Sequence, residues 1–252
     1  MNWPTRQLHE AIAPLLPGFH FDVLEQIDST NSELMRRARS GQMQPVLVLA
    51  GQQTEGRGRL GRRWSSDLSF SLGVPLSPVN WSGLSLAVGL SLVQSLHPDL
   101  GLKWPNDVWW NGRKLAGILI ETASFGTVRY LVVGIGINVK PPAGLELSTG
   151  PAWLQELRPE LDAPEALLEI AAPLVQTIKR FEESGFGPFQ ASFNARDVLR
   201  LRQVTLTDGT VGMAQGVDRE GALQVLTDQG LVSVSSAEVS VRPVPSPLSV
   251  RT

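Results

Sequence analysis

The chain has 252 residues, of which 42% are hydrophobic and 18% charged, and its formal net charge is −2. This apolar fraction excludes wholesale disorder, and the near-neutral charge argues against a surface built for nucleic acid. The absence of cysteine excludes disulfide frameworks, thiolate metal sites and cysteine nucleophiles. The three histidines lie far apart and have no metal-ligand spacing.

No segment has the pattern of a membrane span or a secretory signal. The most apolar stretch, residues 84–96, is too short for a span and is interrupted by serines and Gln94. The first residues lack a basic start followed by an apolar run. We therefore expect a cytoplasmic protein.

The first quarter of the chain alternates helical and extended patterns. Helical spacing of apolar residues predicts a helix over residues 3–16. Thr30 and Glu33 match a capping box, which predicts a helix over residues 31–40. Residues 52–66 are rich in glycine and arginine without a period, which predicts a loop. Strands are expected over residues 19–23, 45–50 and 69–74.

The middle of the chain predicts a core helix, a hairpin and a long helix. Residues 84–96 form the helix, and Asn111-Gly112 is a strong hairpin turn. A helix is expected over residues 164–183, where Pro173 would kink or divide it, and a short one over 188–195. Strands are expected over residues 102–104, 108–110, 113–121 and 128–139.

The pattern changes after residue 199. Asp208-Gly209, Glu220-Gly221 and Gln229-Gly230 separate short strands, which predicts a small antiparallel barrel. The five strands are expected over residues 204–206, 211–217, 223–226, 232–234 and 239–241. We therefore expect an α+β domain over residues 1–198, a barrel over 199–243 and a flexible tail over 244–252.

A glycine- and arginine-rich segment, residues 56–64 (GRGRLGRRW), is the first candidate for chemistry; we name it the arginine loop. Its glycines allow the backbone to bend toward a ligand, and arginine forks match phosphate and carboxylate oxygens. Such a loop could close over an anionic nucleotide and exclude water. The alternative is a flexible basic loop that binds RNA without specificity.

Lysine is scarce, and two of the four lysines fall in one short window. Lys103 and Asp107 belong to KWPND, and Lys114 follows across the hairpin. A strand, a sharp break and a hairpin return would bring these three side chains together. They could hold a polyphosphate with Mg²⁺ or offset charge on a transferring phosphoryl group. Ordinary surface charge on a hairpin is the alternative.

Two further segments are weaker signals. Gly134 and Gly136 end an apolar run, which suggests close approach of a ligand or another backbone, and Asn138 could bond a base edge or a ribose. Residues 28–31 (DSTN) begin a helix, whose N-terminus can bind a polar ligand, although capping alone would explain Thr30. Trp64 is the tryptophan we expect to contact a ligand.

Taken together and in this order, the four segments resemble the biotin–protein ligases. The family pattern is DSTN, QTxGRGRxGRxW, KWPNDxxxxxxKxxGIL and GxGxN, and it covers roughly residues 25–140 here. The resemblance implies a mixed-sheet catalytic domain, similar to the class II synthetases and shared with lipoate ligases, followed by an SH3-like barrel. Lipoate ligases are not known for the arginine loop, so a lipoate or octanoate ligase is the second hypothesis. An RNA-binding module is the third.

The resemblance also implies a two-step reaction and a set of site residues. Biotin reacts with MgATP to give biotinyl-5′-AMP, and a lysine of a carboxylase biotin-carrier domain then takes the biotin. The implied catalytic residues are Lys114, Arg57, Arg59, Lys103 and Asp107. The implied biotin contacts are Ser29, Thr30, Asn31, Gln53, Gly56, Arg57, Arg59, Lys114, Gly117 and Ile118. The implied nucleotide contacts are Arg59, Arg62, Trp64, Lys103, Gly134, Gly136 and Asn138.

Expectations about partners follow from the same resemblance. Some family members carry an N-terminal winged-helix domain that binds DNA, and the 27 residues before Asp28 cannot hold one. We therefore expect a monofunctional ligase that does not bind DNA or a membrane. An exposed sheet edge would allow a homodimer.

Overall fold

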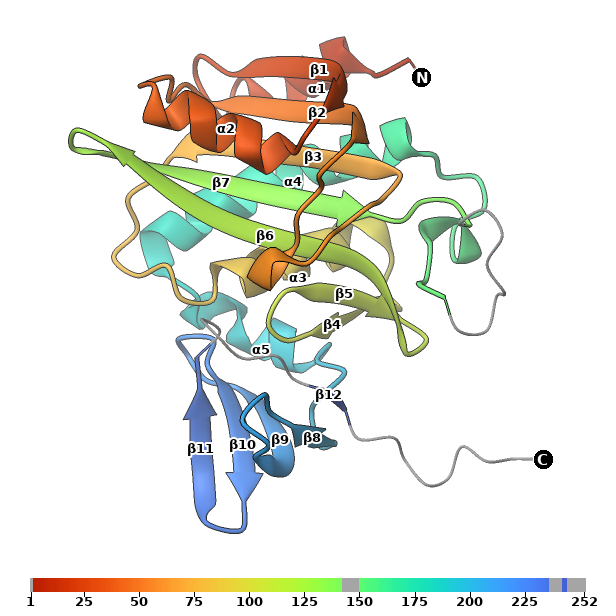
Figure 1. Cartoon of the computed structure of the whole chain (residues 1–252), viewed down its shortest axis with the longest axis vertical. Helices are drawn as coiled ribbons and strands as arrows, with labels where there is room; N and C mark the ends of the chain where they lie inside the picture. The colour runs from red at the N-terminus through yellow and green to blue at the C-terminus, as the bar shows by residue number, and fades with distance from the viewer. Residues whose placement is uncertain (1, 142–149, 236–241, 244–252) are drawn as a thin grey trace.

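The computed structural model describes residues 2–141, 150–235 and 242–243. It contains a seven-stranded sheet with helices on both faces and a separate five-stranded sheet below it (Figure 1). The strand order of the larger sheet is β1-β2-β3-β7-β6-β5-β4. Strands β1 (His20–Ile27) and β2 (Val46–Gln53) are parallel, and the other pairs are antiparallel. The mixed sheet and the α+β class are therefore confirmed.

The remaining strands of this sheet follow the expected segments closely. They are β3 (Leu68–Pro75), β4 (Gly101–Lys103), β5 (Asp107–Trp110), β6 (Arg113–Phe125) and β7 (Val128–Ile137). Strand β6 runs four residues beyond its expected end, because it pairs with β7 along its whole length as far as Phe125 and Val128.

The two faces of the sheet have different covers, because successive side chains of a strand point to opposite sides. On one face, Phe70 joins the core formed with α1 (Thr5–Ile12), α3 (Leu84–Leu96) and α4 (Ala163–Ser184). On the other face, α2 (Thr30–Arg39) packs Leu34 against the sheet. Buried Ser69 and Ser71 alternate with the apolar residues of β3, so this second face is polar where α2 begins.

The long helix crosses Pro173 without interruption, so the expected division at this proline is wrong, and the expected kink stays a prediction. Its N-cap, Asp162, and Glu165 form a reciprocal capping box. Ile170 and Leu174 are fully buried on either side of Pro173, and this burial offsets the missing backbone donor.

Two helical boundaries differ from the expectation. Helix α1 ends at Ile12, because Pro14 has no N–H with which to continue the ladder of hydrogen bonds. The short helix expected over residues 188–195 is a 3-10 turn, Gly187–Phe189, followed by α5, Gln190–Asn194.

The C-terminal sheet is antiparallel, with the order β11-β10-β9-β8-β12. Its strands are β8 (Gln203–Thr205), β9 (Val211–Val217), β10 (Leu223–Thr227), β11 (Gly230–Val234) and β12 (Arg242–Pro243). The strand expected over residues 239–241 and the tail over 244–252 lie outside the described residues. The boundary at residues 198–199 and the closure of this sheet into a barrel stay predictions.

Direct contacts hold the C-terminal sheet against the part of the chain that carries the seven-stranded sheet. The buried Trp104 donates its indole N–H to the Gly221 carbonyl at 3.1 Å. Asn194 of α5 accepts from the Val217 N–H at 2.8 Å and donates to the Val217 carbonyl at 3.1 Å. The KWPND segment is thus fixed from below by the C-terminal sheet.

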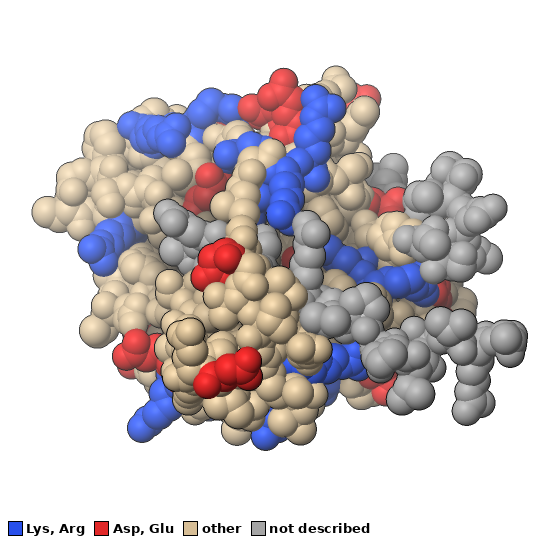
Figure 2. Space-filling model, turned by 60° about the horizontal axis from the view of Figure 1, so that its bottom comes forward, with Lys and Arg blue, Asp and Glu red and all other residues tan. Residues whose placement is uncertain are grey.

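Within the described residues, no helix combines the length and the apolarity that a bilayer crossing demands. Basic and acidic side chains are interspersed on the face that carries the C-terminal sheet (Figure 2).

Candidate active site

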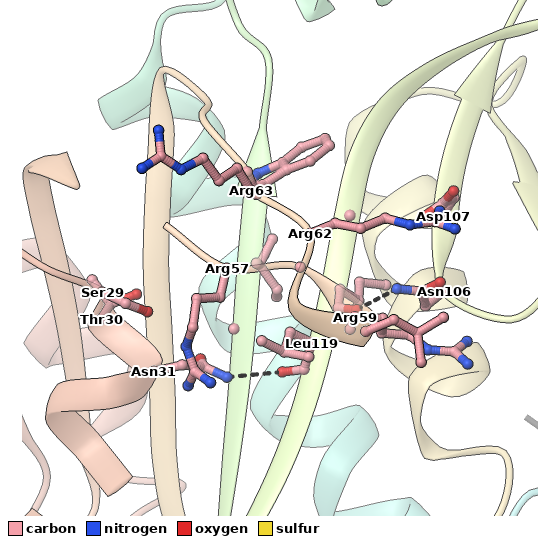
Figure 3. Close-up of a pocket in the computed structure, with 18 of the residues that line it drawn as sticks. Ser29, Thr30, Asn31, Arg57, Arg59, Arg62, Arg63, Asn106, Asp107 and Leu119 are labelled. Atoms are coloured by element: carbon pink, nitrogen blue, oxygen red, sulfur yellow. Dashed lines mark hydrogen bonds between the residues drawn. The ribbon is translucent and has the colours of Figure 1, made fainter. Parts of the chain in front are cut away.

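A cavity of about 370 Å³ lies between the start of α2, the arginine loop and the central strands β3, β6 and β7. Figure 3 shows side chains from all these elements around it. Fifteen of the residues implied by the resemblance line this cavity: Ser29, Thr30, Asn31, Gln53, Arg57, Arg59, Arg62, Trp64, Lys103, Asp107, Lys114, Gly117, Ile118, Gly134 and Gly136.

The start of α2 is built differently from the expected capping box. Ser29 is the N-cap, and its hydroxyl accepts the Ser32 N–H at 3.4 Å. Glu33 does not reach back to the cap and pairs with Arg36 and Arg37 instead. The expectation that Thr30 caps the helix is therefore wrong, and the Thr30 hydroxyl contacts Gln53 and Ser71 at the cavity instead.

Thr30 and Gln53 form a polar pair at one end of the cavity. The Gln53 side-chain oxygen accepts from the Thr30 N–H at 2.8 Å and from the Thr30 hydroxyl at 3.2 Å. The Ser71 hydroxyl lies 2.7 Å from the Thr30 hydroxyl. Thr30 is thus held in one geometry by Gln53 of β2 and Ser71 of β3.

Just before the helix, the hydrogen bond from Arg36 lowers the pKa of Asp28 to about 2, so this carboxylate stays charged.

Asn31 is buried and uses both ends of its amide within the protein. Its side-chain N–H₂ donates to the Leu119 carbonyl at 3.3 Å (Figure 3) and to Glu121 Oε2 at 2.8 Å. Its oxygen accepts from the Ser71 hydroxyl at 2.6 Å. Asn31 therefore ties α2 to β3 and β6 while it lines the cavity.

The arginine loop folds back on itself as a short hairpin. The Gly58 N–H donates to the Arg62 carbonyl at 2.7 Å, and the Trp64 N–H donates to the Gly56 carbonyl at 2.9 Å. Leu60 forms the tip in a left-handed conformation, with φ of 56°. Gly56 does not line the cavity: a Cβ there would lie 2.2 Å from the Trp64 carbonyl oxygen, so glycine is needed to close the hairpin.

The arginines of this loop are spread along the cavity (Figure 3). Arg57 extends toward Asn31, and its Nη2 lies 3.0 Å from Glu121 Oε2. Arg62 extends toward Asp107 at the other end. Burial lowers the pKa of Arg59 from its usual high value, while the Asp107 charge opposes this effect. An elongated anionic ligand would meet a guanidinium at either end.

The hairpin gathers Lys103, Asp107 and Lys114, as its spacing predicts. The turn at Asn111 and Gly112 has positive φ at both positions, and β4, β5 and β6 then pair side by side. Lys114 Nζ lies 2.7 Å from Asp107 Oδ1. The same ammonium lies 4.4 Å from the centroid of the Trp64 ring. A lysine, a carboxylate and an indole thus meet at one point of the cavity wall.

Two glycines of β7 leave room for neighbouring side chains. A Cβ at Gly136 would lie 1.9 Å from Trp64 Nε1, and one at Gly134 would lie 2.2 Å from Asn31 Oδ1. The sequence predicts close approach at both positions, and the structure assigns the approaching groups: the indole of the arginine loop and the amide of α2.

Asn138 lies outside the cavity lining. Its side-chain N–H₂ donates to the Ala152 carbonyl at 3.1 Å, and its backbone pairs with Leu115 and Leu154. In the described residues it fixes the chain after β7. A contact between Asn138 and adenine stays a prediction.

Sequence reasoning left part of the lining unassigned. These residues are Gly58, Leu60, Arg63, Phe70, Pro105, Asn106, Leu119 and Ile135. Asn106 had a readable signal, since it lies between two chosen residues; its amide donates to the Ile118 carbonyl at 2.7 Å and holds the hairpin. Phe70 and Ile135 carry none, because their place at the cavity depends on strand pairing between β3 and β7.

The side chains of the cavity show which groups could hold a metal ion. The described residues contain no group of three His, Cys, Asp or Glu side chains that could hold one. Asp107 is the one carboxylate among the described residues that line the cavity. Mg²⁺ commonly takes one or two carboxylates and completes its shell with water and substrate phosphates. The residues therefore fit a Mg²⁺ that arrives with a triphosphate.

Comparison with known proteins gives two family matches. Residues 23–138 match the biotin/lipoate A/B protein ligase family, and residues 202–242 match the biotin protein ligase C-terminal domain. The biotin–[acetyl-CoA-carboxylase] ligase of Mycobacterium tuberculosis is 35% identical, with 86% of this chain and 87% of that protein covered. The bifunctional ligase/repressor BirA of Escherichia coli is 32% identical, with 90% and 75% covered.

A solved structure has the same architecture. The biotin protein ligase from Aquifex aeolicus in complex with biotin and ATP superimposes with a TM-score of 0.75 at 29% identity. The match covers 90% of this chain and all of that one. The relatives, the two matched models and this structure agree, and the chain belongs to the biotin protein ligase family.

Proposed function

We propose that this chain is an ATP-dependent biotin–protein ligase, which activates biotin as biotinyl-5′-AMP and transfers it to a lysine of a carboxylase carrier domain. The observation that carries the proposal is the single cavity in which Lys114, Asp107 and the arginine loop face the start of α2. The α2 end offers hydroxyl and amide groups beside Arg57, and the other end offers Arg62 and Lys114, which suits a ligand with a polar ring and an anionic tail.

Biotin would bind at the end nearest α2. Ser29, Thr30 and Gln53 supply hydroxyl and amide groups for the ureido ring, and the backbone near Gly117 borders the side chain. The hydrogen bonds between Thr30 and Gln53 support this role, because they hold both groups before a ligand arrives. The biotin carboxylate would then extend toward Arg57 and Arg59.

Activation would take place at the other end. A biotin carboxylate oxygen attacks the α-phosphorus of ATP, the bond to the bridging oxygen breaks, and pyrophosphate leaves with that electron pair. Lys114 offsets the negative charge that develops on the α-phosphate. Arg59 and Arg62 cover the phosphates, and Trp64 stacks on the adenine.

Lys103 and Asp107 would support the polyphosphate. Asp107 orients Lys114 through their ion pair and is the residue that would hold Mg²⁺. The metal, when bound, draws electron density from the phosphate oxygens.

Transfer would follow in the same cavity. The neutral amine of the carrier lysine attacks the acyl carbon, the amide bond forms, AMP leaves, and the amine loses one proton. Closure of the arginine loop would keep water from the mixed anhydride until then. The names of the relatives support a carrier domain of acetyl-CoA carboxylase as the partner.

The deciding experiment is exchange of labelled pyrophosphate into ATP with biotin, lipoate or octanoate as the acid. Biotin-dependent exchange, followed by labelling of a purified carrier domain, is the expected result. Exchange with lipoate or octanoate alone would establish the second hypothesis, and no exchange with any acid would refute a ligase.

Two further proposals concern assembly. The sheet edges β1 and β4 would allow a homodimer, which sedimentation with and without biotin and ATP tests. We also expect no sequence-specific binding to duplex DNA, and a mobility shift by this chain would contradict that expectation.

A further inference from the structure

A tryptophan outside the cavity lining contacts one of the lysines that belong to it. Lys103 lines the cavity, whereas Trp109 of β5 does not. The Lys103 ammonium lies 5.1 Å from the centroid of the Trp109 ring, which is within the range of a cation–π interaction. The proposed reaction uses Lys103 and leaves Trp109 without a role.

The pairing of β4 with β5 explains why these two side chains meet. Lys103 lies opposite Asp107, and Gly101 lies opposite Trp109. Opposite residues of an antiparallel pair share a face, and so do residues two apart on one strand, so Lys103, Asp107 and Trp109 project from the same face. Gly101 has no side chain, and the diagonal neighbour Lys103 is therefore the β4 side chain beside the indole. Diagonal neighbours are within reach of aromatic and long side chains.

Hydrogen bonding does not account for the indole of Trp109 in the described part of the chain. Its Nε1 is buried and has no acceptor among residues 2–141, 150–235 and 242–243. A buried donor without a partner costs ~1–3 kcal/mol, a cost that phenylalanine or leucine would avoid at this position. The ring face does account for a tryptophan, because the indole attracts a cation more strongly than the other aromatic side chains do.

Each of the two lysines that line the cavity has an indole beside it. Lys114 Nζ lies 2.7 Å from Asp107 Oδ1 and 4.4 Å from the centroid of the Trp64 ring. Lys103 has the Trp109 ring in the corresponding place. A lysine side chain carries about 2 kcal/mol of rotamer entropy, and part of it is lost when the ammonium binds an anion. A ring that restricts the side chain beforehand lowers this cost at ligand binding.

We propose that Trp109 is a positioning residue, which acts through Lys103 to hold its ammonium at the phosphate end of the cavity before ATP binds. The placement itself is a property of the ligand-free protein. The consequence for catalysis rests on the proposed function: an ammonium placed in advance strengthens the binding of the polyphosphate and leaves the binding of biotin unchanged.

Acetylation of the four lysines of the chain gives a direct readout in the ligand-free protein. Acetic anhydride reacts with the neutral amine, whereas the ring face favours the ammonium and covers one side of it. Trp109→Leu and Trp109→Met should therefore speed acetylation of Lys103 about threefold relative to Lys179, which corresponds to ~0.7 kcal/mol at 1.4 kcal/mol per tenfold. Trp109→Phe retains a ring face and should speed it by a smaller factor than either. Peptide masses identify the acetylated lysines.

A neighbouring tryptophan supplies the matched control. Trp110 follows Trp109 on β5 and packs against the core on the opposite face, with its ring centroid 5.6 Å from the Arg113 guanidinium. Trp110→Leu removes an indole from the same hairpin and should leave acetylation of Lys103 at the wild-type rate. Urea unfolding followed by circular dichroism tests the global stability of each variant.

Pyrophosphate exchange tests the consequence for the reaction. Trp109→Leu should raise the KM for ATP about threefold and leave the KM for biotin unchanged, whereas a general loosening of the cavity would raise both. In a Lys103→Met background, Trp109→Leu should not change the KM for ATP further, because the ring then has no ammonium to hold.

The outcomes separate the placement of Lys103 from its consequence. Wild-type acetylation of Lys103 in Trp109→Leu and Trp109→Met would overturn the inference, and so would an equal acceleration in Trp110→Leu or in Trp109→Phe. An unchanged KM for ATP in an active Trp109→Leu enzyme would refute the placement at the phosphates. No exchange with any acid in the wild-type protein would refute the proposed function and leave the acetylation result standing.

Discussion

Replacement of Lys114 by alanine should remove most of the activation step while the fold persists. The ammonium is the cation held 2.7 Å from Asp107 and against the Trp64 ring. Two unit charges about 4 Å apart interact by ~4 kcal/mol at an effective dielectric constant of about 20. Asp107 already offsets part of this charge, so the net loss should be smaller. Loss of one positioned donor typically lowers kcat by about 10²- to 10³-fold, and we expect this range.

Biotin-dependent pyrophosphate exchange measures this step directly. Lys114→Ala should lower kcat, with a much smaller change in the KM for biotin, because the charge is needed in the transition state. Lys179→Ala is the matched control; this ammonium donates to the Leu15 carbonyl at 3.3 Å on the far face of the sheet. Exchange by Lys114→Ala within tenfold of the wild type, in a variant with a normal urea midpoint, would refute the role given to Lys114.

Three further changes test the supports of the cavity. Gly136→Ala should displace the Trp64 ring and cost ~1–3 kcal/mol in urea unfolding, whereas Gly58→Ala, with its nearest neighbour at 3.5 Å, should cost much less; equal costs would count against the packing. Asp67→Ala should cost ~1–3 kcal/mol, because the Asp67 carboxylate accepts two backbone N–H groups after β7 at 2.9 and 3.0 Å; an unchanged urea midpoint would contradict this. Burial raises the pKa of Asp197 to about 6, so the folded protein holds a proton that the unfolded chain has already lost above about pH 4. The wild-type free energy of unfolding should therefore decrease as the pH rises from about 4 to about 6, and Asp197→Asn should remove up to ~3 kcal/mol of this decrease. Parallel urea–pH profiles for the two proteins would exclude the Asp197 effect.

The main elements could be read from the sequence because their signals are local. Helix α3 begins and ends where its apolar run does, and the turn at Asn111-Gly112 depends on two adjacent residues. The hairpin then brought Lys103 and Lys114 into one wall of the cavity, since register follows from the turn.

The remaining features of the site could not be predicted, because they depend on contacts between segments that lie far apart in the sequence. Nothing near Gly136 in the sequence identifies Trp64 as the side chain above it, because strand pairing and the return of the arginine loop create that contact. Glu121 was missed for the same reason: it follows a motif on β6, and its partners lie 64 and 90 positions away. At the start of α2, two adjacent hydroxyl residues both suit an N-cap, and the competing bond from Thr30 to Gln53 decides between them.

The hydrogen bond from Trp104 to the Gly221 carbonyl has a practical consequence for engineering this enzyme. Trp104 lies between two residues of the cavity, Lys103 and Pro105, so its anchor lies in a different domain from the chemistry. A Cβ at Gly221 would lie 2.7 Å from Gly83 Cα, which leaves no space for a side chain at this joint. A biotinylation tool shortened to the catalytic domain alone would therefore expose the Trp104 indole and remove a support of the neighbouring Lys103. A chimera with a foreign C-terminal domain would need a glycine at the position of Gly221.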